Sequence, residues 1–190
     1  RLTISLMLAS LLMTNARAQV TNFSQDVNTA IDRGLNWLDG QNAFTNNSAA
    51  AGAAGLVALA LLEKPRSADQ NAVAQGYADA IAADQARIEA IIAYIIDQSN
   101  GGFQAYKDGA NLMALSVYLR TGGPNQAGAL AALNRIFDRV VANQGNHGYW
   151  GYNDGNRQDS STTQLVMAGL GAARAVYRDP AFDDAPRLAI

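Results

Sequence analysis

The chain contains no cysteine, and His147 is its single histidine. Without cysteine there are no disulfide bonds and no thiolate ligands, so a zinc site would have to be built almost wholly from carboxylates. The loop around His147 also lacks a serine or cysteine nucleophile in a recognisable motif. We therefore expect no metal site, no cofactor and no catalytic residue that the sequence alone identifies.

Charge is also scarce, and no stretch of the chain is strongly basic. Charged residues make up 16% of the 190 residues, and the formal net charge is -2. Nucleic acids and anionic membranes are bound through clustered positive charge, so neither is an expected partner. Hydrophobic residues make up 49%, which is ample for a packed core, and the length fits one domain.

The chain begins with the features of an export signal. Arg1 precedes an apolar run over residues 2–13, which is about a dozen residues and shorter than the roughly 20 that span a bilayer. Residues 15–18 read NARA and contain the A-x-A pattern typical of signal-peptide cleavage. We interpret residues 1–18 as a signal peptide and residues 19–190 as the domain of a secreted or periplasmic protein with no stable membrane span.

Beyond this leader, half-polar and wholly apolar helical patterns alternate three times. Three apolar stripes at helical spacing predict amphipathic helices: Val27, Ile31, Leu35 and Leu38; Ile88, Ile91, Ile92, Ile95 and Ile96; Leu130, Leu133, Phe137, Val140 and Val141. We expect Ser24 to cap the first helix and Asp84, Arg135 and Arg139 to face solvent. Nearly uncharged stretches predict enclosed helices over residues 49–62, 110–119 and 162–175.

This alternation predicts an all-α fold of about three helical hairpins in a double layer. The amphipathic helices would form an outer row, and the apolar helices would form an inner row behind them. Gly52, Gly55, Gly169 and Gly171 are expected to let the inner helices approach closely. Close packing would then offset the cost of about 1 kcal/mol that each glycine adds to helix formation.

Two loops resemble each other and indicate a repeated unit. Residues 98–103 read QSNGGF, and residues 144–150 read QGNHGYW. We expect Gln98, Phe103, Gln144 and Trp150 to act as staples, because glutamine binds free backbone groups, glycine permits the turn and an aromatic ring packs under its neighbour.

The second of these loops, with Gln144, Gly148 and Trp150, resembles the QW motif of the terpene cyclase and protein prenyltransferase superfamily. Residues 33–41 and 98–103 resemble degenerate copies of it. The resemblance covers roughly residues 24–175 and implies a squalene-hopene cyclase-like alpha/alpha toroid. Since three hairpins are fewer than a closed ring of this family contains, it implies a partial ring with an open edge.

The residues that give this superfamily its activities are missing in recognisable form. The Asp-x-Asp-Asp acid of hopene-type cyclases does not occur, and the zinc and thioester chemistries of other relatives require a cysteine. The resemblance therefore implies an exported, non-catalytic binding or interaction module. Two alternatives stay open. One is an isoprenoid cyclase whose acid motif lies outside this chain, and the other is a carbohydrate-active lyase or hydrolase that uses Asp154 and Asp159.

Candidate ligand contacts cluster in the last loop, where Tyr149, Trp150, Tyr152 and Asp159 combine aromatic rings with a polar group. The expected occupant is an apolar or glycan small molecule or a partner protein, at the concave face or the open edge. Self-association is a further way to cover that edge. Residues 161–164 read STTQ and predict a capping box at the start of the last helix, with Asp159 as added negative charge.

Overall fold

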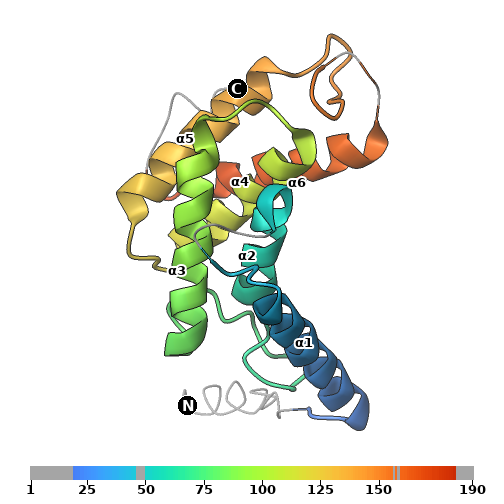
Figure 1. The fold of residues 1–190 in the computed structure, drawn as a ribbon, viewed down its shortest axis with the longest axis vertical. Coiled ribbons are helices and arrows are strands. Elements are labelled where there is room, and N and C mark those ends of the chain that lie inside the picture. The colour runs from blue at the N-terminus through green and yellow to red at the C-terminus, as the bar shows by residue number, and fades with distance from the viewer. Residues whose placement is uncertain (1–18, 46–49, 156, 158, 183–190) are drawn as a thin grey trace, which may run out of the picture.

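A computed structural model describes residues 19–45, 50–155, 157 and 159–182 (Figure 1). The expected signal peptide, residues 1–18, lies outside the described residues. The all-α class is confirmed, because the described part contains two isolated β-bridges and otherwise only helices and turns. None of its helices combines the length and the apolar character that a membrane crossing requires.

Six α-helices and two short 3-10 helices make up this part of the chain. They are α1 (Asn22–Gly40), η1 (Ala51–Ala53), α2 (Ala54–Leu62), α3 (Ala82–Asp97), η2 (Gln98–Asn100), α4 (Ala105–Arg120), α5 (Gln126–Ala142) and α6 (Ser160–Tyr177).

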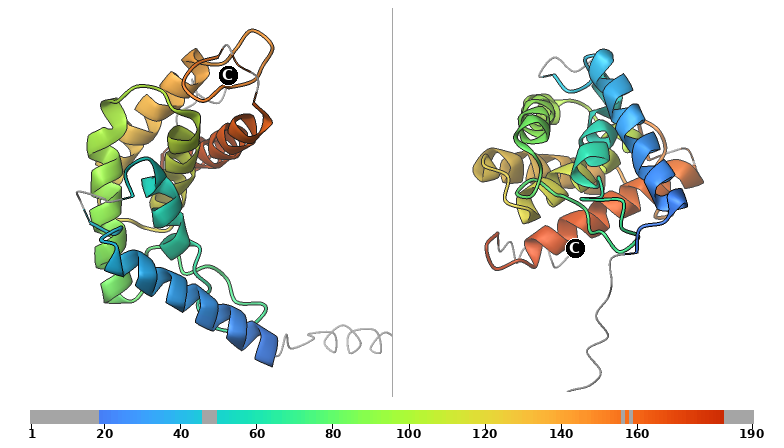
Figure 2. Two further views of the ribbon diagram at one scale, coloured as in Figure 1. Left: turned by 45° about the vertical axis from the view of Figure 1, so that its right-hand side comes forward. Right: turned by 90° about the horizontal axis from the view of Figure 1, so that it is seen from below.

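Helix α4 is the centre of the molecule. It packs between α2 and α6, while α3 packs mainly on α2 and α5 mainly on α4. Helices α2, α4 and α6 therefore form one row, and α3 and α5 form a second row against it. Helix α1 packs on α2 and is also joined to α3 by the ion pair of Asp39 and Arg87, at 2.8 Å. Figure 2 shows the helices following a curve that runs from α1 to α6.

The apolar stripes expected for α3 and α5 are buried. On α3 the buried members are Ile88, Ile91, Ile92 and Ile95, and on α5 they are Leu133, Phe137 and Val140. The expected members Ile96, Leu130 and Val141 are partly buried, and Ile136, which was not expected, is buried as well. Enclosure is confirmed for α4, which buries eleven of its sixteen residues. Enclosure is incomplete for α2 and α6, because each has only one neighbouring helix in the row. Leu56 on α2 and Met167 on α6 remain 48% and 61% exposed.

Three glycines allow the row of α2, α4 and α6 to pack closely. A Cβ on Gly55 would lie 2.4 Å from the carbonyl carbon of Ala110, and one on Gly169 would lie 2.6 Å from the carbonyl oxygen of Gly109. Gly109 itself faces the backbone of Leu165, and the sequence analysis did not predict this close contact. The expectation for Gly52 and Gly171 was wrong, because a Cβ on Gly171 would meet nothing within 4 Å and one on Gly52 only a side-chain oxygen at 3.4 Å.

Of three charged residues expected to face solvent, Asp84 is buried and Arg139 is largely buried, whereas Arg135 is exposed as expected. Asp84 is 3% exposed and binds Arg87 from its own helix. The guanidinium groups of Arg135 and Arg139 extend from α5 to Ser99 in η2. Asp84 also accepts from Gln75 and pairs with Lys64, so all three side chains have a partner on another segment of the chain, which a single-helix pattern does not reveal.

The strongest of these contacts is a bidentate ion pair between Arg139 and Asp108. Nη2 lies 2.8 Å from Oδ1 and Nε lies 3.0 Å from Oδ2, and the Asp108 side chain is fully buried. Arg139 also donates to the carbonyl oxygen of Ser99 at 2.6 Å. The pair ties α5 to the first turns of α4, because both oxygens of the carboxylate are satisfied in a site shielded from water.

Helix starts differ from the sequence expectation by a few residues. Thr21, not Ser24, caps α1: Thr21 Oγ1 accepts from the Ser24 N–H, and Ser24 Oγ accepts from the Thr21 N–H. This reciprocal pair is a capping box, and Ser24 is its downstream member. The described helix α2 begins at Ala54, and α4 begins five residues before the expected start at residue 110.

Candidate functional site

The loop between α5 and α6, which contains the predicted ligand contacts, is anchored by Trp150. Its side chain is 4% exposed, and Nε1 donates to the carbonyl oxygen of Val140 near the end of α5 at 2.8 Å. The Trp150 backbone binds the hydroxyls of Thr162 and Thr163 at the start of α6. These bonds join the end of α5 to the start of α6 within one hairpin, and the predicted packing of the ring under a neighbouring unit stays a prediction.

The two glutamines of the repeated loops do not join neighbouring hairpins as expected. Gln144 Nε2 donates to the carbonyl oxygen of Gly148 within its own turn, and Gln98 Nε2 donates to the adjacent Asp97. The link between hairpins comes from the backbone, since the Ala105 N–H at the start of α4 donates to the carbonyl oxygen of Tyr152 at 2.8 Å. Phe103 is half-buried against the core.

Asp159 caps α6, and the expected box of Ser161 and Gln164 is wrong. Asp159 Oδ1 accepts from the N–H groups of Ser161 and Thr162 at 2.9 and 3.0 Å and from Ser161 Oγ at 2.5 Å. These bonds, the Ser161 hydroxyl first, lower the pKa of Asp159. A carboxylate satisfies several amides and complements the positive helix end, so α6 begins at Ser160.

Tyr152 and Asp159 belong to a surface cluster that also contains Tyr106 and Ser161, and we name these four residues the tyrosine platform. The Tyr106 and Tyr152 rings lie 5.4 Å apart at 50°. The Tyr106 hydroxyl lies 2.5 Å from Ser161 Oγ, which itself donates to Asp159. Tyr106 is 37% exposed and Tyr152 is 51% exposed, so both rings are accessible.

Electrostatics within the tyrosine platform favour neutral hydroxyls beside an ionised carboxylate. A hydrogen bond with Tyr106, followed by the negative charge of Asp159, raises the pKa of Tyr152. Near neutral pH the tyrosine platform therefore presents two aromatic rings, two phenolic hydroxyls and one anionic acceptor.

Tyr149 lies elsewhere in the same loop, where its ring stacks on His147 with centroids 6.1 Å apart. Of the four predicted contacts, the structure thus joins Tyr152 with Asp159, buries Trp150 and turns Tyr149 toward His147. The sequence analysis missed Tyr106, which lies 55 positions before Ser161 in another hairpin. No sequence pattern marked it, because the helix was predicted to begin at residue 110, and Tyr106 meets Ser161 only where the first turn of α4 lies opposite the first turn of α6.

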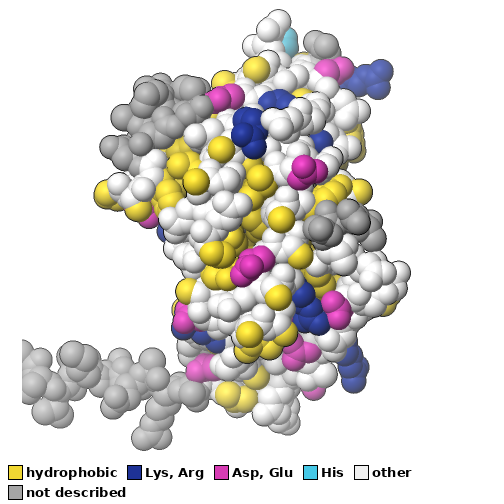
Figure 3. Space-filling model, turned by 60° about the vertical axis from the view of Figure 1, so that its left-hand side comes forward, with side chains coloured by type: hydrophobic (Ala, Val, Ile, Leu, Met, Phe, Trp, Pro, Cys, Tyr) yellow, Lys and Arg dark blue, Asp and Glu magenta, His cyan; other side chains and the backbone are white. Residues whose placement is uncertain are grey.

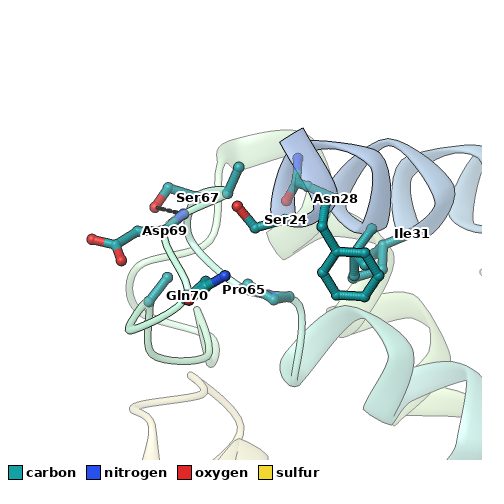
Figure 4. Close-up of a pocket in the computed structure, with 11 residues that line it drawn as sticks. Ser24, Asn28, Ile31, Pro65, Ser67, Asp69 and Gln70 are labelled. Atoms are coloured by element: carbon teal, nitrogen blue, oxygen red, sulfur yellow. Dashed lines mark hydrogen bonds between the residues drawn. The ribbon is translucent and has the colours of Figure 1, made fainter. Parts of the chain in front are cut away.

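A shallow apolar cleft of about 300 Å³ lies between the first half of α1 and the connection over residues 65–72 (Figure 4). Phe23, Val27 and Ile31 form its α1 wall. On the other side, Asp69 binds the backbone of Gln19 and Asn71, and these bonds lower the pKa of Asp69. The carboxylate therefore fastens the connection to the start of the described chain.

No group of three or more histidine and acidic side chains among the described residues is placed to hold a metal ion. Figure 3 shows acidic and basic side chains interspersed on one face, with apolar side chains between them.

Comparisons with protein-family models, curated proteins and solved structures found no match.

Proposed function

We propose that this chain is an exported, non-catalytic binding module that holds a neutral saccharide on the tyrosine platform. A sugar presents an apolar C–H face to an aromatic ring and hydroxyls to polar groups, and the tyrosine platform offers both. The observation that supports this proposal most directly is the accessible ring pair of Tyr106 and Tyr152, 5.4 Å apart, beside the Asp159 carboxylate.

The state of Asp159 supports binding rather than catalysis. Its pKa is lowered by the Ser161 hydroxyl and by the amides that it caps, so near neutral pH it has no proton to donate. A glycosidase needs a protonated acid opposite a second carboxylate. Asp159 is therefore better suited to accept ligand hydroxyl groups than to act as an acid.

A partial alpha/alpha toroid is the arrangement that we propose for the whole domain. The row of α2, α4 and α6 behind α3 and α5 supports it, as does the parallel register of the row. Close contacts join the second residue of α2, Gly55, to Ala110 of α4, and Gly109 of α4 to Leu165 of α6. The starts of these helices therefore lie toward one end, where the tyrosine platform is built.

Affinity electrophoresis tests the proposal directly. The protein is run in native gels containing dextran, xylan, glucomannan or hydroxyethyl cellulose. We expect at least one polysaccharide to retard it and Tyr152→Ala to abolish the retardation. This variant keeps the carbonyl oxygen that binds Ala105. Trp37→Ala removes another accessible aromatic ring, 65% exposed on α1, and is the matched control.

Unretarded migration of the wild-type chain in all four gels contradicts the proposal. So does equal retardation of the wild type and Tyr152→Ala. Loss of retardation in Trp37→Ala alone would place the binding surface on α1 and would contradict binding at the tyrosine platform.

A further inference from the structure

A second cleft, of about 310 Å³, lies on the other side of the first turns of α4. Tyr106 faces α6, whereas Gln104, Lys107 and Asn111 line this cleft together with η1 and the end of α3. The cleft is thus a polar recess between two hairpins, and it shares no residue with the tyrosine platform.

Asn111 gives the cleft its unusual chemistry. The residue is 4% exposed, and its Oδ1 is buried without a hydrogen-bond partner among the described residues. Buried polar side chains are nearly always paired, because an unpaired acceptor loses its hydration without compensation. A ligand hydroxyl group in the cleft would supply the missing donor.

Lys107 adds a positive charge to the same wall. Its Nζ donates to the carbonyl oxygen of Gly102 at 3.3 Å, and the side chain is half-buried. No acidic residue lines the cleft. The nearest carboxylates along the chain are both paired, because Asp108 pairs with Arg139 and Asp97 accepts from Gln98, which itself lines the cleft.

The opposite wall includes Ala51 and Gly52 of η1, which leads directly into α2. Neither η1 nor α2 has a side-chain cap among the described residues.

We propose that this cleft binds a small hydroxylated carboxylate of monosaccharide size. The carboxylate would pair with Lys107, and a hydroxyl group would donate to Asn111 Oδ1. The cleft volume lies at the lower end of the range for small-molecule sites. Simple anions lack the hydroxyl donor, and neutral sugars lack the charge for Lys107.

Titration of the ¹⁵N-labelled protein with D-glucuronate tests this assignment, with D-glucose and acetate as separate arms. We expect saturable shifts of the Gly52 and Lys107 amides and the Asn111 side-chain amide with glucuronate, and weaker binding of the other two probes. Lys107→Gln is expected to weaken glucuronate binding about tenfold or more, because a charged hydrogen bond is lost. Arg120→Gln, which removes an exposed cation at the other end of α4, is the control and should bind like the wild type.

Asn111→Leu separates a binding role from a structural one. The substitution removes the unpaired acceptor, so we expect unfolding at the same or a higher temperature together with loss of glucuronate binding. The proposal is overturned if the wild type shows no saturable shift with glucuronate. It is also overturned if acetate binds equally well or if a folded Asn111→Leu protein keeps its affinity.

Discussion

At the scale of single residues, backbone contact at Gly109 sets how closely α4 approaches α6. A Cβ there would lie 2.6 Å from the carbonyl oxygen of Leu165 and 2.8 Å from its carbonyl carbon. Backbone atoms cannot rotate away as a side chain can, so the helices would have to separate. We expect Gly109→Ala to lower the free energy of unfolding by about 1–3 kcal/mol, the usual range for overpacking.

Gly171→Ala is the matched control for that prediction, since it lies in α6 with open space around its Cα. It should raise the free energy of unfolding by about 0.5–1 kcal/mol, because alanine restricts the unfolded chain and favours the helix. Urea titration measures both variants, and equal effects of the two substitutions would show that α4 and α6 do not touch at Gly109.

The ion pair of Asp108 and Arg139 is a second residue-scale feature with a measurable consequence. Asp108→Asn leaves Arg139 as a largely buried cation without its carboxylate. We expect a loss of about 3 kcal/mol or more in the free energy of unfolding, as for other broken buried pairs. The double variant Asp108→Leu with Arg139→Met should lose less than Asp108→Asn alone, and a larger loss would contradict this account.

At the scale of elements, the start of α6 depends on the ionised form of Asp159. Its folded pKa is lowered, so its stabilising contribution is present above the unfolded value of about 3.8 and is lost as the pH falls through the folded pKa. The difference in melting temperature between the wild type and Asp159→Asn should therefore shrink on acidification below 3.8. A difference that stays constant from neutral to strongly acidic pH would show that the charge does not stabilise the cap.

The elements also show how far the sequence predicts the fold. Apolar periodicity identified the helices and the buried stripes of α3 and α5, because burial on one face leaves a pattern within each helix. On α1 only Leu35 of the expected stripe is buried, and Val27 is 41% exposed. Caps were displaced by a few residues, because Thr21 and Asp159 compete with nearby serines whose geometry only the folded chain decides. Arg139 was assigned to solvent, because its partners Ser99 and Asp108 belong to another hairpin.

The candidate site was predictable to the extent that it lies within one loop. Tyr152 and Asp159 were identified from their spacing after the helix, and Asp159 was recognised as a residue at the start of α6. Tyr106 and Ser161 were not predicted as contacts, because the tyrosine platform forms where the first turns of α4 and α6 meet. The cleft at Asn111 likewise depends on the approach of η1 to α4, which no local pattern encodes.

At the scale of the whole molecule, protection should be highest in α4 and lowest in α1. Helix α4 lies between two helices of its row, whereas α1 buries only Leu35, packs on α2 and is otherwise joined to α3 by the partly exposed ion pair of Asp39 and Arg87. Local opening of α1 therefore costs little of the total packing. Native-state hydrogen exchange should show the α1 amides exchanging well before those of α4. Equal protection of the two helices would contradict the arrangement.

The most direct test of the binding proposal is a ¹⁵N correlation spectrum of the labelled protein, titrated with oligosaccharides of whichever polysaccharide retards it. The account predicts saturable shifts that concentrate on Tyr106, Tyr152 and Ser161, at the adjoining starts of α4 and α6. Shifts confined to α1 or to the end of the row, or no saturable shift, would contradict the claim that the tyrosine platform is the binding site.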